Sequence, residues 1–412
     1  MGNVSLKNKS RIIREAVKQY KTPLYLYDLD FFDSNITKLR DKLFSGSGLY
    51  FSIKANPLAR LCQIAHRAGC GVEIASAGEL ELALRAGIPP EDIVFTGPGK
   101  TEKELEAAIK AEISMINAES IQEIRIIQGI AEKAGKIVPI ALRINPSERK
   151  GTGKVRMSGV ASQFGIEETD LTDGLFEEIV SMPNIKLCGI HVYMGTSILE
   201  AEEICKNTEY AIELGLRLAS KYSFELTYLN VGGGFGIPYF PGENELDIEE
   251  LGRGMRQLEH TYKSRLTGTK MYFESGRYLL AECGVFLIRV LYRKKSKGNC
   301  YLVCDGGANF HASSAFLGRF VRGNFPMYVL GKSGDEKEFY VTGPSCTPTD
   351  LLGQKVKLPE DTAEGDIIVI EKSGAYGLTY SPYGFLSHAL PAEVGYRAEG
   401  GFHVLISGRN TE

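Results

Sequence analysis

The feature that most constrains the fold of this chain is a regular alternation of short β-rich runs with amphipathic helical patterns, from about Tyr50 to Glu274. The strand candidates are Leu49–Ile53, Gly71–Ala75, Ile93–Thr96, Ile113–Asn117, Val138–Ile144, Lys186–Met194, Leu226–Val231 and Lys270–Phe273. The helical stretches between them include Leu58–Ala68, Gly78–Ala86 and Glu102–Ala111. Eight strands that alternate with helices over roughly 225 residues predict an α/β chain with a closed parallel (β/α)₈ TIM barrel.

Local signals mark where several of these helices begin and end. Thr101, with Glu104 three residues later, predicts a capping box at the start of one helix. Gly69 and Gly87 stand where two other helices should end.

The pattern changes after residue 276. Runs rich in valine, tyrosine and isoleucine follow, separated by Gly, Lys and Pro turns, at Val285–Tyr292, Cys300–Cys304, Phe339–Thr342 and Asp366–Ile370. They predict a second, antiparallel β domain. The first 35 residues hold a helical pattern and the strand-like run Pro23–Tyr27, which we assign to the same domain. The predicted division is therefore 36–276 for the barrel, and 1–35 with 277–412 for a β-barrel-like domain.

Composition excludes several classes of function. The 412 residues are 43% hydrophobic and 24% charged, with a net charge of −3, so no basic footprint for nucleic acid or an anionic membrane is present. We find no apolar signal core and no run long enough to span a bilayer. The eight cysteines are scattered without a Cys-x-x-Cys pair, which predicts a reducing cytoplasm and no metal site. Cys300 and Cys304 are interpreted as core thiols.

In a barrel of this type, functional side chains lie at the carboxyl ends of the strands, and phosphate binds after the seventh and eighth. The residues that meet this condition are Lys54, Glu73, His191, Tyr193, Gly232, Gly233, Gly234, Glu274 and Arg277. An amine at the end of a buried strand loses hydration, which favours its neutral, nucleophilic form. Consecutive glycines let backbone N–H groups close on an anion.

Each of these features has an ordinary structural interpretation when it is taken alone. A lone strand-end lysine usually reaches solvent, a glycine-rich turn is usually structural, and a glutamate near an arginine usually forms an ion pair. Together, however, an amine for an aldehyde, a phosphate cradle and an acid for a pyridinium nitrogen describe pyridoxal 5′-phosphate (PLP).

Six motifs occur in order along nearly the whole chain: YFSIKAN around Lys54, VEIASAGEL from Val72, LNVGGGF before and through the glycines, ESGRYLLA from Glu274, GPSC ending at Cys346 and SGAY ending at Tyr376. With them, the chain resembles the fold-type III PLP decarboxylases, the family of diaminopimelate and ornithine decarboxylases, whose barrel is alanine racemase-like. The resemblance implies a PLP-dependent carboxy-lyase that works as a homodimer with its sites at the interface.

The resemblance also implies roles for individual residues. Lys54 carries the cofactor as a Schiff base, and Glu274 pairs with the pyridine nitrogen. Gly232, Gly233, Gly234, Arg277 and Tyr376 hold the phosphate, while Glu73, His191 and Tyr193 complete the cofactor site. Cys346, contributed by the partner subunit, returns a proton after CO₂ leaves; from the residues alone it would be a buried structural thiol. Whether His191 acts in the reaction or only in the structure stays open.

Departures from the family pattern bear on the substrate. Most relatives have histidine at the position of Tyr193. Relatives that bind a distal substrate ammonium usually have an acidic residue at that of Thr347, and diaminopimelate enzymes have an arginine near Ser313. The segments GIHVYMGT, GPSCTPTD and SGAYGLTYSP most resemble the butirosin-pathway branch of antibiotic biosynthesis, which acts on L-glutamate thioesterified to an acyl carrier protein. Arg277, Thr347 and Tyr376 are the predicted substrate contacts.

We therefore expect decarboxylation of a carrier-bound glutamyl group to a 4-aminobutyryl group. Arg319, Arg322 and Lys332 are candidate contacts for an acidic carrier surface. The alternative within the class is decarboxylation of a free amino acid, meso-diaminopimelate first. A protein of another class, a non-catalytic regulator on the same fold, is the remaining hypothesis.

Overall fold

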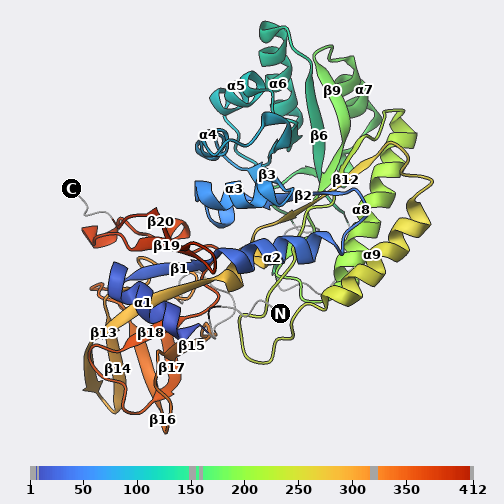
Figure 1. Cartoon of the computed structure of the whole chain (residues 1–412). Helices are drawn as coiled ribbons and strands as arrows, with labels where there is room; N and C mark the ends of the chain where they lie inside the picture. Colours follow the sequence, from blue (N-terminus) through green and yellow to red (C-terminus); the bar gives the residue numbers. More distant parts are fainter. Residues whose placement is uncertain (1–5, 7–8, 148–154, 157–160, 316–322, 409–412) are drawn as a thin grey trace. The chain divides into compact units, whose positions relative to one another are not determined.

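The computed structural model of the chain describes residues 6, 9–147, 155–156, 161–315 and 323–408. They form two compact units, which Figure 1 colours along the sequence. The barrel unit comprises the described residues of 36–237 and 244–276, and the sheet unit comprises those of 1–35, 238–243 and 277–412. Segment 238–243, which the sequence-based division assigns to the barrel, belongs to the sheet unit.

The barrel unit is built on eight parallel strands, each close to a predicted run. They are β2 (Gly48–Ser52), β3 (Gly71–Ile74), β4 (Ile93–Phe95), β5 (Met115–Ala118), β6 (Val138–Asn145), β9 (Ile185–Val192), β11 (Tyr228–Asn230) and β12 (Lys270–Ser275). Their hydrogen-bonded order is β5-β4-β3-β2-β12-β11-β9-β6, and pairing of β5 with β6 closes the ring. The predicted (β/α)₈ barrel is confirmed.

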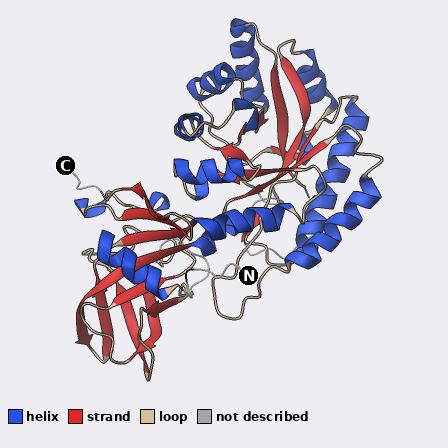
Figure 2. Cartoon of the chain, viewed as in Figure 1, coloured by secondary structure: helices blue, strands red, loops and turns tan. Residues whose placement is uncertain are grey.

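Helices follow the barrel strands and flank them in Figure 2. They are α3 (Ala59–Arg67), α4 (Ala77–Arg85), α5 (Glu102–Ala111), α6 (Ile121–Ala134), α7 (Asp173–Ser181), α8 (Ala201–Tyr222) and α9 (Ile248–Tyr262), while α2 (Leu29–Arg40) spans the boundary of the two units. The capping box at Thr101 and Glu104 is present as predicted. Gly69 follows α3 with a φ of 85°, where a residue with a Cβ would be strained. Three short strands, β7 (Val155–Arg156), β8 (Ile166–Glu167) and β10 (Gly195–Thr196), lie in loops.

Aromatic side chains fill the barrel interior. Tyr50 and Tyr272 stack at a ring separation of 5.1 Å, and Tyr228 lies 4.7 Å from Tyr272. Val94 and Met115 pack in the same buried cluster. Because this filling closes the interior, the polar groups that could act on a ligand are those at the strand ends.

The sheet unit contains a nine-stranded sheet with α1 (Ser10–Tyr20) packed on its core. Its strands are β1 (Leu24–Asp28), β13 (Gly284–Ser296), β14 (Asn299–Cys304), β15 (Met327–Val329), β16 (Glu336–Thr342), β17 (Leu351–Pro359), β18 (Ile367–Ile370), β19 (Ala392–Arg397) and β20 (Gly401–Ile406). Strand β1 pairs with β13, as its assignment to this domain required. The sheet is mostly antiparallel, but β1–β19 and β14–β16 are parallel pairs.

Two smaller observations complete the fold. Cys300 and Cys304 are buried on β14, as predicted for core thiols. Across the described ranges, we find no helix with the length and apolar character needed to cross a bilayer.

Candidate active site

Lys54 lies just beyond the end of β2, on a short 3₁₀ turn (Ile53–Ala55). Its ammonium contacts both carboxylate oxygens of Glu73, with Nζ–Oε1 and Nζ–Oε2 distances of 2.8 and 3.0 Å. Register places this carboxylate there, because Ser52 of β2 pairs with Glu73 of β3. The Lys54 side chain is 45% exposed and Glu73 is 1% exposed. The expected loss of hydration at the amine is therefore wrong for this structure, and a buried carboxylate faces a half-exposed ammonium instead.

Glu274 and His191 approach each other from β12 and β9. The distance from His191 Nε2 to Glu274 Oε1 is 3.5 Å, and both side chains are buried. Burial raises the pKa of Glu274 to about 8, and the nearby Glu73 carboxylate contributes in the same direction. Burial holds the pKa of His191 well below its ordinary value, and the charge of Arg143 lowers it further. The imidazole is therefore neutral, and the contact is not an ion pair.

His191 also has unused hydrogen-bonding capacity. Within the described part of the chain, neither of its ring nitrogens has a hydrogen-bond partner, although the side chain is only 1% exposed. Buried polar groups are normally satisfied, so this imidazole is an exception that needs an explanation. Tyr193, predicted on the same strand face, lies just past the end of β9 and is half-buried.

The three glycines after β11 are required by close packing. A Cβ on Gly233 would lie 1.8 Å from the carbonyl oxygen of Glu274, and one on Gly234 would lie 2.4 Å from that of Gly195. Gly232 and Gly234 also have φ values of 67° and 88°, which favour glycine. Among the described residues, the N–H groups of Gly233 and Gly234 donate to no protein acceptor. The loop therefore offers two backbone donors to a ligand.

Asn230, the last residue of β11, is a site residue that sequence reasoning missed. Its Nδ2 donates to Glu274 Oε1 at 2.8 Å and to the Tyr228 hydroxyl at 2.9 Å. Its Oδ1 accepts from the N–H of Gly232 at 2.9 Å. Because Gly232 N–H is engaged in this way, it differs from the two glycine donors that follow. The available signal was its place two residues before the glycine run.

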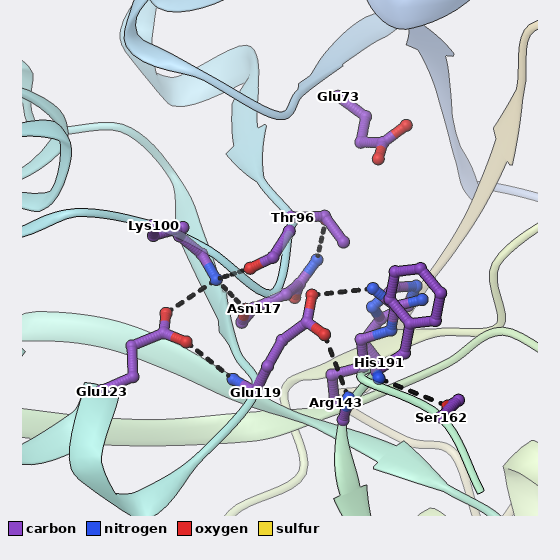
Figure 3. Close-up of polar contacts among 12 residues, drawn as sticks. Glu73, Thr96, Lys100, Asn117, Glu119, Glu123, Arg143, Ser162 and His191 are labelled. Atoms are coloured by element: carbon purple, nitrogen blue, oxygen red, sulfur yellow. Dashed lines mark hydrogen bonds and ion pairs between the residues drawn. The ribbon is translucent and has the colours of Figure 1, made fainter.

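A second polar group lies at the ends of β4 and β5, around Lys100 (Figure 3). The Lys100 side chain is 1% exposed, and its Nζ lies 2.7 Å from Glu123 Oε1. It also donates to the carbonyl oxygens of Gly97 at 2.7 Å and Asn117 at 2.9 Å. Two of the three ammonium donors are therefore hydrogen-bonded to backbone carbonyls, and the charge is paired with the Glu123 carboxylate.

The same group continues to Arg143 on β6. Glu123 Oε2 accepts from the N–H of Glu119 at 3.0 Å, and Glu119 Oε1 accepts from Arg143 Nη1 at 2.7 Å. Glu119 Oε2 accepts from the N–H of Gly165 at 3.0 Å, and the guanidinium lies 4.7 Å from the ring centre of Phe164. Figure 3 shows these residues in one connected network, with His191 beside it and Glu73 apart from it.

Arg277 and Tyr376, both in the sheet unit, lie together. The Arg277 guanidinium is 4.6 Å from the Tyr376 ring centre and 5.6 Å from that of Tyr239. Arg277 Nη1 donates to the Tyr239 hydroxyl at 3.2 Å. Tyr376 has a φ of 55°, a left-handed conformation that a bulky residue rarely adopts. Sequence reasoning missed Tyr239.

Cys346 is exposed, so the interpretation from residues alone, a buried structural thiol, is wrong. Its loop is fixed by Asp350, whose carboxylate is buried and accepts from the N–H groups of Ser345 at 2.7 Å and Ala308 at 2.6 Å. Next to the thiol, the Thr347 hydroxyl lies 3.0 Å from that of Thr349. Ser313 donates its hydroxyl to the Tyr376 carbonyl oxygen at 2.7 Å.

The family of this chain follows from comparison with known protein families. Residues 34–281 match the model of the pyridoxal-dependent decarboxylase family, pyridoxal binding domain. The chain belongs to the pyridoxal-dependent decarboxylases. As a member of this family, it is a carboxy-lyase of fold-type III whose cofactor is pyridoxal 5′-phosphate.

Individual relatives support the family assignment. The decarboxylase is 40% identical over 388 residues to an L-glutamyl-[BtrI acyl-carrier protein] decarboxylase of Niallia circulans, covering 93% of this chain and 90% of the relative. It is 30% identical to a diaminopimelate decarboxylase of Aquifex aeolicus, covering 90% and 86%. Its structure matches diaminopimelate decarboxylase from Helicobacter pylori complexed with L-lysine with a TM-score of 0.86 at 26% identity, covering 96% of each chain.

The side chains of this decarboxylase fit pyridoxal phosphate. The barrel unit has a half-exposed amine, Lys54, for the aldehyde and two backbone N–H groups at the glycine loop for an anion. Among the described residues, the buried carboxyl of Glu274 has no cation in an ion pair with it, and a pyridinium nitrogen is the kind of cation that such an acid stabilises. The donor set therefore suits each part of the cofactor.

Proposed function

We propose that this protein decarboxylates an L-amino acid carried as a thioester on an acyl carrier protein, with a glutamyl group as substrate and a 4-aminobutyryl group as product. The observation that carries the proposal is the 40% identity to the L-glutamyl-[BtrI acyl-carrier protein] decarboxylase, which extends over 93% of the chain. The diaminopimelate decarboxylases are more distant in sequence.

The barrel unit would hold the cofactor. Lys54 would bind its aldehyde carbon, and Glu73 would neutralise the lysine before the cofactor binds. The N–H groups of Gly233 and Gly234 would donate to the phosphate, with Gly232 shaping the turn. Glu274 would hold the proton on the ring nitrogen. When bound, pyridoxal phosphate supplies an electron sink for the electron pair that remains when a carboxylate leaves as CO₂.

The sheet unit would supply the other predicted groups. Arg277 and Tyr376 would bind phosphate or substrate, and Cys346 would donate the proton that replaces CO₂ at the substrate α-carbon. In a homodimer, this thiol would come from the partner subunit. The exposure of Cys346 supports the proposal, because a thiol that donates a proton to a substrate on another subunit must lie at the protein surface.

Charge supports a thioester over a free diamino acid. Thr347 is neutral, so it cannot pair with a distal ammonium, and a buried unpaired ammonium costs several kcal/mol. Ser313 is also neutral, and its hydroxyl is engaged with Tyr376. A thioester needs neither counter-charge, because esterification removes the side-chain carboxylate.

The predicted carrier contacts have less support. Lys332 lies 2.7 Å from Asp366 and 3.4 Å from Asp361, so its charge is already compensated. Arg319 and Arg322 lie outside the described residues. The docking surface for the carrier thus stays a prediction.

The test is a CO₂-release assay with three substrates: glutamyl-carrier protein, free L-glutamate and meso-diaminopimelate. We expect turnover only with the first. Lys54→Ala should abolish CO₂ release. It should also abolish the increase in protein mass after borohydride treatment, which would fix the bound cofactor covalently to the lysine. Lys186→Ala, which removes an exposed lysine of β9, is the control and should leave both intact. Robust lysine formation from diaminopimelate would transfer the assignment to the free amino acid, and absence of any bound cofactor would favour a non-catalytic protein.

A further inference from the structure

Asn230 occupies a position that connects two parts of the cofactor site. It lies on β11, between β9 and β12 in the barrel order, and pairs in register with His191 of β9. It is fully buried, and both amide atoms are hydrogen-bonded. One end of the amide contacts the carboxyl of Glu274, and the other contacts the first glycine of the loop.

The chain adds two direct links between the same partners. The backbone N–H of Glu274 donates to the carbonyl oxygen of Gly232 at 2.7 Å. The Glu274 carbonyl oxygen occupies the space that a Cβ on Gly233 would need. The glycine loop and Glu274 are therefore locked through main-chain contacts, and Asn230 is the side chain that extends this lock to the carboxyl group.

An amide satisfies both contacts when the Glu274 carboxyl is ionised, the form that pairs with a protonated ring nitrogen. The Gly232 N–H needs an acceptor, whereas an ionised Glu274 carboxylate needs a donor. An aspartate in this place could accept from Gly232, but it would set a second carboxyl against the first. Alanine would leave the Gly232 N–H and a carboxyl oxygen without partners in a buried site.

We propose that Asn230 is a positioning residue that couples the phosphate loop to Glu274, so that seating the cofactor phosphate fixes the carboxyl that faces the ring nitrogen. The inference rests on the proposed roles of the glycine loop and Glu274. Asn230 itself touches no reacting atom. Its effect reaches the cofactor through the orientation and ionisation of Glu274.

The test is a double-mutant cycle between Asn230→Asp and Glu274→Gln, with PLP affinity measured by equilibrium dialysis and folding followed by circular dichroism. Asn230→Asp alone should weaken PLP binding by roughly 10- to 100-fold, the range for a lost hydrogen bond to a charged group. It should also shift the pH dependence of the bound cofactor's absorption band. In the Glu274→Gln background, the same exchange should cost less than about threefold, because the new amide can donate to the new carboxylate.

Tyr228→Phe is the matched control, because it removes the third contact of Asn230 and keeps those to Gly232 and Glu274. It should change PLP affinity by less than about threefold. Equal effects of Asn230→Asp in both backgrounds, or unchanged affinity and spectrum, would overturn the inference. If Asn230→Asp alone does not fold, the double variant decides: folded and PLP-binding protein supports the coupling, and unfolded protein contradicts it. Wild-type protein that binds no PLP would instead refute the proposed function.

Discussion

Two arcs of the barrel mouth differ in how their buried ionisable groups are paired. The closed arc, at the ends of β4, β5 and β6, contains Lys100, Glu119, Glu123 and Arg143. Each charge in it has a partner within the chain. The open arc, at the ends of β9, β11 and β12, contains His191, Gly232–Gly234 and Glu274. It buries an imidazole without hydrogen bonds and a carboxyl without a cation, among the described residues.

The difference separates scaffold from site. A region whose buried charges are all paired internally gains rigidity but has no charge left to offer a ligand. The open arc retains unsatisfied donors and a perturbed acid, which is the pattern expected where a ligand completes the structure. Arg143 connects the two arcs, because its charge belongs to the closed arc and also lowers the pKa of His191.

The largest effect is expected from breaking the closed arc. Glu119→Gln leaves the buried guanidinium of Arg143 without its counter-charge and should lower the free energy of unfolding by about 3–5 kcal/mol. Urea unfolding of the cofactor-free protein measures this. Glu178→Gln, which breaks the exposed pair with Arg125, is the control and should have little effect. Similar midpoints for the two variants would show that the closed arc does not stabilise the barrel.

The open arc should respond in the opposite sense. Glu274→Gln should lower kcat by about 100-fold or more, on the scale of losing one preorganised electrostatic group, because the ring nitrogen loses the carboxylate that would keep it protonated. The stability of the cofactor-free protein should hold or rise, because the exchange removes a buried ionisable group next to Glu73. Activity assays and urea unfolding of one preparation compare the two quantities. A loss of stability as large as that of Glu119→Gln would remove the distinction between the arcs.

The pH dependence gives a sharper form of the same prediction. The folded-state pKa of Glu274 is raised from 4.5 to about 8, so its protonation favours the folded state. This contribution is fully present below pH 4.5 and is lost as the pH rises through about 8. Between these limits, cofactor-free wild type should lose several kcal/mol relative to Glu274→Gln, because each unit of pKa shift is worth about 1.4 kcal/mol. Parallel stability curves for the two proteins would contradict the assigned shift.

The sequence predicted the framework of both arcs better than their contacts. Strand periodicity located Lys54 and Glu274 at strand ends, because alternation along the chain is a local property. Pairing is not local. That Glu73 would neutralise Lys54 depends on the register of β2 with β3, and that Asn230 would meet both Gly232 and Glu274 depends on the order of three strands.

The exposure of individual side chains could not be predicted from the local sequence either. Cys346 follows an apolar strand and reads as a core thiol, yet the buried carboxylate of Asp350 fixes a loop that leaves the thiol exposed. Tyr239 lies far in sequence from Tyr376, and only the fold brings both rings to Arg277. The ordered motifs still identified the family, because they depend on residue identity and do not require the contacts to be known.

The smallest effect expected concerns the helix caps that support the closed arc. The Ser120 hydroxyl accepts from the N–H of Glu123 at 3.1 Å, so Ser120→Ala should cost about 1 kcal/mol of unfolding free energy. Thr101→Ala, at the exposed cap of α5, is the matched comparison. If the closed arc does not contribute to the cofactor site, neither variant should change PLP affinity. Ser120→Ala should lower the free energy of unfolding more than Thr101→Ala, because it also loosens Glu123 and, through it, Lys100. Weaker PLP binding by Ser120→Ala alone would show instead that the closed arc helps to shape the cofactor site.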